Sequence, residues 1–140
     1  SLSANLSNVA LERDDIVGDR DPLDVCVLTE KVITHGDILV KAKPIGGLRM
    51  IDFNQADDKI ICVLNNDAFY GEIEDISELP PLVVERLRHY FLTYKDLPTG
   101  EKRNVEIPQI YGAEEAKKVI MASIEDYNNR YDNFEAMFNI

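Results

Sequence analysis

Short apolar runs bounded by turn residues occupy the first half of the chain and predict β-strands. The runs cover residues 25–28, 37–48 and 59–64, and residues 48–52 form a further extended piece. Pro44 and the Gly46–Gly47 pair are expected to end or bulge the middle strand. Polar segments interrupt these runs: residues 1–18 are weakly patterned, and loops are predicted at 12–19 and 53–59.

The second half of the chain repeats its apolar residues with a helical period. Asp75 and Ser77 are candidate N-caps, and Pro80–Pro81 suits a first helical turn. The stripe that follows predicts a helix ending near Pro98–Gly100 and consists of Leu79, Val83, Leu87, Phe91 and Tyr94, with Leu82 and Tyr90 beside it. An extended segment at 104–108 precedes a second helix from about Ala113. Its predicted inward residues are Ala116, Val119, Ile120, Ser123, Ile124 and Tyr127.

The order of these elements, strands first and helices after, predicts an α+β domain. We expect a small barrel with two main helices packed outside. The 140 residues are enough for one domain with its own core, so residues 1–140 are interpreted as a single domain. Apolar residues in the tail at 131–138 either extend the second helix or dock in another subunit.

The composition narrows the classes of partner. A formal charge of −11 disfavours nucleic acid and anionic membranes, because the long-range field repels phosphate. A phosphate-bearing substrate remains possible where metal ions supply local positive charge. Cys26 and Cys62 both lie in apolar runs and are interpreted as core residues of a reducing compartment. No run approaches the ~20 apolar residues of a membrane span, and no signal peptide is visible, so a cytoplasmic location is expected.

Two groups of carboxylates flank the predicted strands. The first is Asp19, Asp21 and Asp24, with Pro22 between them, and the second is Asp52 and Asp57, with Lys59 two residues on. Like charges this close repel one another, and a strand end that is half buried needs a counter-charge. A barrel could bring both groups together, and oxygen ligands without His or Cys suit Mg²⁺ or Mn²⁺.

Other interpretations of the first acidic group were weighed. A calcium-binding EF-hand loop fails, because positions five and six counted from Asp19 are Leu23 and Asp24. An aspartyl-phosphate nucleophile normally ends an apolar strand, which residues 12–18 do not form. A solvated acidic loop stays open as the alternative to a metal site.

Four motifs carry a resemblance to a known family. DRDPLDV, PIGGLRMID, the spacing Asp52…Asp57-x-Lys59 and RLRHYFLTYKDL occur in this order. The stretch that they define, from residue 19 to about residue 125, resembles the family I soluble inorganic pyrophosphatases. The resemblance implies a five-stranded barrel of the OB type with helices outside.

The resemblance also implies an activity, hydrolysis of inorganic pyrophosphate to two phosphates by a metal-activated water, with several Mg²⁺ ions per site or Mn²⁺ in their place. Asp19, Asp24 and Asp57 resemble the ligands of the first metal, and Asp24 also resembles a ligand of the second. Asp52 and Asp57 resemble ligands of metal arriving with the substrate. Asp21 resembles the carboxylate that accepts a proton from the metal-bridging water. The groups that resemble phosphate ligands are Lys59, Tyr94 and Lys95. Short members of the family imply a homo-oligomer, with a hexamer favoured.

The sequence departs from the family at its start. The family has an upstream region with further active-site residues, so we expect the chain to be the C-terminal part of a pyrophosphatase or to lack upstream residues and N-terminal strands. Arg20 and Arg49 stand where a small residue and a lysine are common. Two alternative functions follow: a truncated or decayed, non-catalytic acidic domain that binds metal or a partner, and, more weakly, an OB module for oligonucleotides, which would want a basic groove.

Overall fold

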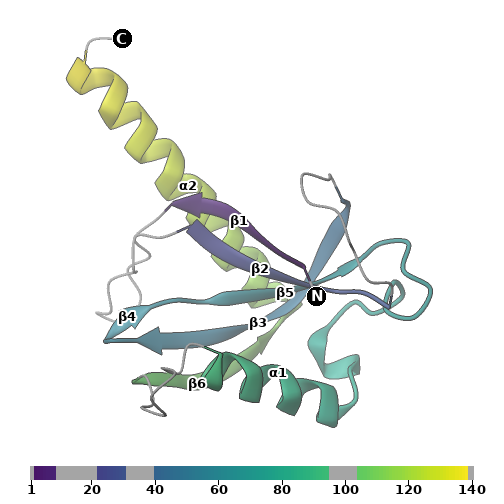
Figure 1. The fold of residues 1–140 in the computed structure, drawn as a ribbon. Coiled ribbons are helices and arrows are strands. Elements are labelled where there is room, and N and C mark those ends of the chain that lie inside the picture. Colours follow the sequence, from purple (N-terminus) through teal and green to yellow (C-terminus); the bar gives the residue numbers. More distant parts are fainter. Residues whose placement is uncertain (1, 9–21, 31–39, 95–103, 139–140) are drawn as a thin grey trace.

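The computed structural model describes the backbone of residues 2–8, 22–30, 40–94 and 104–138, and the side chains of 23–30, 40–94 and 104–129. Strands dominate the first part and helices the second, which confirms the predicted α+β class (Figure 1). In chain order the elements are β1 Leu2–Asn8, β2 Pro22–Leu28, β3 Ala42–Asp52, β4 Gln55–Ala56, β5 Lys59–Leu64, the 3₁₀ helix η1 Ile76–Glu78, α1 Pro81–Thr93, β6 Val105–Gly112 and α2 Ala113–Phe138.

One mixed sheet contains all the strands. Its order is β1-β2-β5-β3-β4, and β6 also pairs with β3. Ile51 and Asp52 pair with both β4 and β6, so these two strands lie on opposite edges of β3. The β2–β5 pair is parallel, and the other pairs are antiparallel. Among the described strands no pairing joins β1 to β6, so the predicted closed barrel is not seen in this part of the chain.

The sheet buries a core on each of its faces. Side chains alternate along each strand, so Ile61 and Val63 of β5 face one way and Ile60 and Cys62 face the other. The first face packs against η1 and α1 through Ile76, Leu79 and Phe91, and the second against α2 through Ala116 and Val119. In Figure 1, α1 and α2 accordingly lie on opposite sides of the sheet.

The middle strand is longer than the pattern indicated. The pieces predicted at 37–48 and 48–52 form one strand, β3, from Ala42 onward, and its pairing with β5 shifts register between Pro44 and Gly46. This shift is the predicted bulge rather than an end. The neighbouring Gly47 is required by packing, because a Cβ there would lie 2.5 Å from the ring of Tyr111 on β6.

Two other expectations are wrong, and a third is too short. Residues 2–8, interpreted as a polar linker, form strand β1 against β2. The loop predicted at 53–59 contains the short strand β4 and ends in three buried residues, Asp57, Asp58 and Lys59. The extended segment predicted at 104–108 continues to Gly112 as β6.

The second helix starts where predicted, but part of its inward face is exposed. Ala116, Val119 and Ser123 are buried, whereas Ile124 is 43% and Tyr127 49% exposed. The reason is visible in Figure 1, where the C-terminal half of α2 runs beyond the edge of the sheet. The described helices include none with the length and apolarity needed to cross a membrane.

The two cysteines are core residues, as expected. Both are buried and neither forms a disulfide, and strand alternation places them on opposite faces of the sheet. Burial, and the nearby Cys26, raise the pKa of the Cys62 thiol to about 12, so it stays protonated and behaves as a small apolar group.

Candidate active site

A buried lysine connects two of the predicted acidic residues. The ammonium of Lys59 lies 2.6 Å from Oδ2 of Asp24 and 2.7 Å from Oδ1 of Asp57. Parallel pairing of β2 with β5 sets Asp24 beside Lys59, and strand alternation turns both toward the α1 face. Only 2% of the Lys59 side chain is exposed, against 37% for Asp24, so the carboxylate of Asp24 connects the buried ion pair to the surface.

The two carboxylates keep Lys59 charged despite its burial. Burial alone lowers the pKa of Lys59, because a low-dielectric surrounding disfavours the ammonium form. The charge of Asp57 and the hydrogen bonds to Asp24 and Asp57 more than offset this, and the pKa of Lys59 is raised above its usual value. The site therefore contains a fixed positive charge between two acceptors.

A tight hairpin carries the chain from Asp52 to Asp57. Phe53 and Asn54, the two turn residues between β3 and β4, have φ of 50° and 62°, as a two-residue hairpin turn with the strand-matching twist requires. After the turn, the amide of Asp57 donates to the carbonyl of Met50 at 2.9 Å. The hairpin thus turns the chain back so that Asp57 follows directly on β4 and lies two residues before Lys59.

Asp52, the last residue of β3, is 7% exposed. Leu48 and Met50 belong to the core on the α1 face, and the alternation along β3 places Asp52 on that face too. The structure thus puts Asp24, Asp52 and Lys59 on one side of the sheet.

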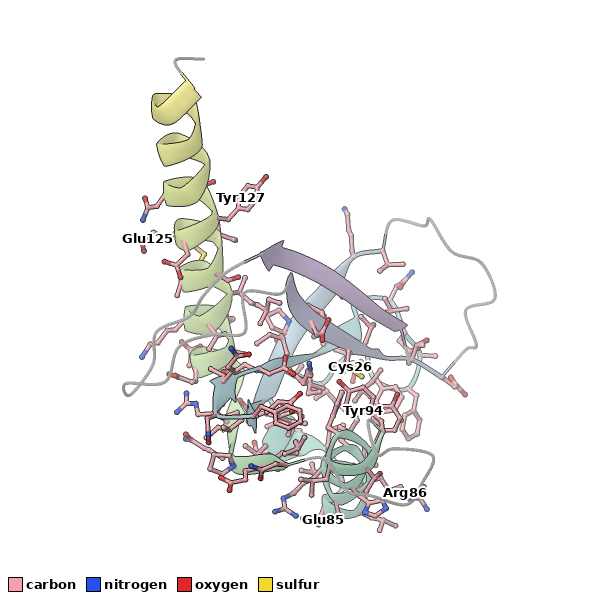
Figure 2. The ribbon with its side chains drawn as sticks, turned by 60° about the vertical axis from the view of Figure 1, so that its left-hand side comes forward. Cys26, Glu85, Arg86, Tyr94, Glu125 and Tyr127 are labelled. Carbon is pink, nitrogen blue, oxygen red and sulfur yellow. The ribbon has the colours of Figure 1, made fainter. Side chains whose placement is uncertain are left out.

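A polar pocket opens beside the ion pair. Its volume is about 160 Å³, and its lining residues come from β2, β5 and α1: Asp24, Val25, Cys26, Lys59, Tyr90, Phe91 and Tyr94. Figure 2 shows Tyr94 and Cys26 in the region between α1 and the sheet. Tyr94, the C-cap of α1, lines the same pocket as Lys59, so this predicted phosphate-binding tyrosine lies near the ammonium.

The structure brings together part of the predicted constellation. Asp24, Asp57, Lys59 and Tyr94 share the pocket or its ion pair. Asp19, Asp21 and Lys95 lie outside the described residues. Within the ranges whose side chains are described, no group of three or more His, Cys, Asp or Glu side chains is arranged to hold a metal.

The donor set nevertheless fits a hard cation. Asp24, Asp52 and Asp57 supply only carboxylate oxygens, which are the ligands that Mg²⁺ and Mn²⁺ prefer. Asp24 and Asp57 already accept from a buried ammonium, which shows that this position stabilises positive charge.

The residues behind the site were missed by the sequence analysis. On the α2 face, the hydroxyl of Tyr111 donates to Oδ2 of Asp58 at 2.9 Å, and both residues are buried. The guanidinium of Arg49 lies 5.4 Å from the Tyr111 ring centroid and donates to Gln109 and Glu115. Alternation along β3 could have placed Arg49 opposite Leu48 and Met50, but nothing local indicated its partners.

A sheet that carries a charged ion pair beside a polar pocket is typical of proteins that bind small, oxygen-rich ligands. The comparisons with known proteins make the class specific. The family model for inorganic pyrophosphatase matches residues 5–128, and the chain belongs to this family.

Individual relatives agree with the family match. The chain is 52% identical over 134 residues to the inorganic pyrophosphatase of Chlamydia caviae, covering 93% of this chain and 62% of that protein. The chain therefore spans less than two thirds of that relative's length. Among solved structures, the Thermus thermophilus inorganic pyrophosphatase matches with a TM-score of 0.74 at 28% identity over 90% of this chain and 68% of that one. The Neisseria gonorrhoeae enzyme matches with a TM-score of 0.67 at 37% identity, covering 77% and 61%.

Proposed function

We propose that the protein hydrolyses inorganic pyrophosphate to two phosphates with Mg²⁺. The observation that carries the proposal is the ammonium of Lys59, held between Asp24 and Asp57 beside a pocket that Tyr94 also lines, in a chain of the pyrophosphatase family. In such a site, the carboxylates can bind the metal that accompanies pyrophosphate, and the ammonium can bind its phosphate oxygens.

The residues divide into three groups by role. Asp19, Asp24 and Asp57 hold the activating metal, with Asp24 shared by a second ion, and Asp52 with Asp57 receives metal arriving with the substrate. Bound Mg²⁺, with Mn²⁺ as a substitute, lowers the pKa of water and neutralises phosphate charge. Asp21 accepts the proton of the attacking water, and Lys59, Tyr94 and Lys95 bind the phosphates.

Lys59 is well suited to phosphate binding. An ammonium has three N–H donors, and the hydrogen bonds to Asp24 and Asp57 account for two of them. A phosphate oxygen that takes the third would make a charge-assisted bond, which is stronger than a neutral one. Because burial and two carboxylates fix the ammonium in place, little side-chain freedom is lost when the substrate binds.

The proposal includes the assembly and the full fold. The sheet closes as a five-stranded OB-type barrel in the whole protein, which works in the cytoplasm as a homo-oligomer, with a hexamer favoured. The described part of α2 supports self-association, because Met121, Ile124 and Tyr127 expose apolar surface at 63%, 43% and 49%. Light scattering of the protein across a concentration series tests the oligomer, and a monomer at all concentrations would rule it out.

Phosphate release from pyrophosphate, titrated with Mg²⁺, tests the activity. Asp21→Asn should lower the rate by about 10²–10⁴-fold, the range for loss of a general base. Asp57→Asn should raise the Mg²⁺ concentration needed for half-maximal rate. Asp67→Asn is the matched control, since Asp67 bonds to Thr29 and to backbone amides of residues 30, 69 and 70, away from Lys59. A folded protein without metal-dependent release would reject the proposal in favour of a non-catalytic acidic domain.

A further inference from the structure

Tyr90 lies one helical turn before Tyr94 on α1, and the two rings stack. Their centroids are 5.3 Å apart with an interplanar angle of 23°. Phe91 packs edge-on against both rings, at 5.6 Å from Tyr94 and 5.1 Å from Tyr90. The spacing of four residues brings side chains together on one helix face, so this contact follows from helix geometry.

Tyr94 lies where its side chain needs support from neighbouring rings. Tyr94 is the C-cap of α1 and is 38% exposed, and terminal residues of a helix are the first to fray. Phe91, a buried residue of the core, packs against the edge of the Tyr94 ring, while Tyr90 contacts its face. The two neighbours restrict the Tyr94 side chain from different directions.

Tyr90 itself lines the pocket that contains Asp24 and Lys59, although 54% of the residue is exposed. A tyrosine this exposed adds little to the core of the domain, and the sequence analysis placed it beside the helical stripe. Its contacts point instead to the pocket. Because Tyr94 and Lys59 line the same pocket, a motion of the Tyr94 ring also changes the surroundings of the ammonium.

We propose that Tyr90 is a positioning residue, whose ring stacks on Tyr94 and holds the Tyr94 hydroxyl at the pocket for a phosphate oxygen. The inference rests on the proposed pyrophosphate hydrolysis. A hydroxyl that is already oriented loses less conformational freedom when substrate binds, so the stack acts on substrate affinity. The proposal assigns the effect to the ring of Tyr90 and not to its hydroxyl.

Steady-state kinetics of Tyr90→Leu and Tyr90→Phe in the intact protein separate ring from hydroxyl. Tyr90→Leu should raise KM for magnesium pyrophosphate by roughly two- to ten-fold, the factor that an aromatic pair is worth, with a smaller change in kcat. Tyr90→Phe keeps the ring and should recover most of that loss. Phe69→Leu is the control, because Phe69 is 65% exposed and pairs with Tyr70, and neither residue lines this pocket.

A double-mutant cycle tests whether Tyr90 acts through Tyr94. Tyr90→Leu should raise KM much less in a Tyr94→Phe background, because the hydroxyl that it positions is already gone. Equal losses in Tyr90→Phe and Tyr90→Leu would assign the effect to the Tyr90 hydroxyl and overturn the inference, as would additive losses in the cycle or an unchanged KM in Tyr90→Leu. Circular dichroism checks the folding of each variant, and Tyr90→Met replaces Tyr90→Leu if the latter does not fold.

A wild-type protein that does not hydrolyse pyrophosphate would reject the proposed function itself. An active wild-type protein with additive losses in the cycle would reject only the role of Tyr90.

Discussion

Among the described residues, Lys59 on one face of the sheet and Arg49 on the other each bond to two side-chain acceptors, yet their surroundings differ. On the α1 face, Lys59 bonds to Asp24 and Asp57 beside a pocket of about 160 Å³. On the α2 face, Arg49 bonds to Gln109 and Glu115 and lies over the ring of Tyr111. The ammonium of Lys59 adjoins an opening to solvent, whereas the guanidinium of Arg49 connects β3 to β6 and α2.

Exposure of the cation does not explain the difference, because the Arg49 side chain is 20% exposed and that of Lys59 only 2%. The two differ in geometry and surroundings, since of the two only Lys59 lines the pocket. A planar guanidinium stacks on an aromatic ring and bonds in several directions at once, which suits it to joining elements. An ammonium is a compact charge that can serve two carboxylates and an arriving phosphate. The predictions below test this contrast, from the largest expected effect to the smallest.

The largest effect is expected for Lys59→Met on the α1 face. Removing the ammonium leaves the buried Asp57 and the neighbouring Asp24 without their shared cation, at a cost of about 3–5 kcal/mol in the free energy of unfolding. Urea unfolding measures the loss, and added Mg²⁺ should recover part of it. Lys43→Met is the matched control, because the surface pair Lys43–Glu74 should contribute only about 0–1 kcal/mol. Equal losses in the two variants would contradict the assignment of Lys59 as a buried, paired charge.

A second substitution overfills the α2 face. The Cβ of Gly47→Ala would lie 2.5–2.7 Å from three atoms of the Tyr111 ring, so the ring must shift. The expected cost is about 1–3 kcal/mol, the usual range for overpacking a core. Thermal unfolding measures it, and combining Gly47→Ala with Tyr111→Leu, which removes the ring, should give less than the sum of the two losses. Full additivity would show that the ring is not the obstacle.

Removing the Tyr111 hydroxyl on the α2 face should lower the free energy of unfolding by as much as Gly47→Ala does, or by less. Tyr111→Phe takes away the donor to Asp58 and leaves a buried carboxylate oxygen without that bond, at about 1–3 kcal/mol. Tyr127→Phe removes a hydroxyl from a half-exposed ring and should cost nothing measurable. Unfolding in urea compares the two variants, and if both unfold at the wild-type midpoint, the Tyr111–Asp58 bond does not stabilise the sheet.

The smallest effect concerns Asp67, at the ends of β2 and β5 remote from Lys59. Hydrogen bonds from the amides of Tyr70, Glu30 and Phe69 and from the Thr29 hydroxyl lower its pKa to about 2. A carboxyl with a depressed folded-state pKa contributes stability that is fully present above its unfolded pKa of about 4 and is lost as the pH falls toward 2.

Asp67→Asn should therefore flatten the stability profile between about pH 4 and pH 2 without changing the metal dependence. Thermal unfolding across this window, compared with wild type, is the measurement. If the variant loses stability with falling pH as steeply as wild type, the group responsible for the acid sensitivity is not Asp67.

Local patterns located several elements but not their partners. A continuous apolar run identified β5 at its exact bounds, and the helical period identified the start of α2 at Ala113. Asp75 was a candidate N-cap, and it does cap η1, but its other oxygen accepts from the amide of Ala113 at 2.8 Å. The second bond lowers the pKa of Asp75 further and ties two helix starts together, which no spacing in the sequence indicates.

The candidate site divides in the same way. The motifs predicted Asp24, Asp57, Lys59 and Tyr94 one by one, and the structure describes where these four residues lie. The roles of all the site residues remain predictions, and Asp19, Asp21 and Lys95 lie outside the described residues. The sequence did not show that a single ammonium joins Asp24 to Asp57, because that contact depends on parallel pairing across 35 residues. It also did not show β1, whose polar residues become a strand only by pairing with β2.

The sequence by itself determined the α+β class, the acidic chemistry and the family, because periodicity and motif spacing are local properties of the chain. The tertiary structure alone decided which carboxylates bond to Lys59 and which face of the sheet carries the pocket. It also decided that residue 47 must be glycine, because the Tyr111 ring packs against it. Those features depend on the register between strands that are distant along the chain, and register is set by packing over the whole sheet.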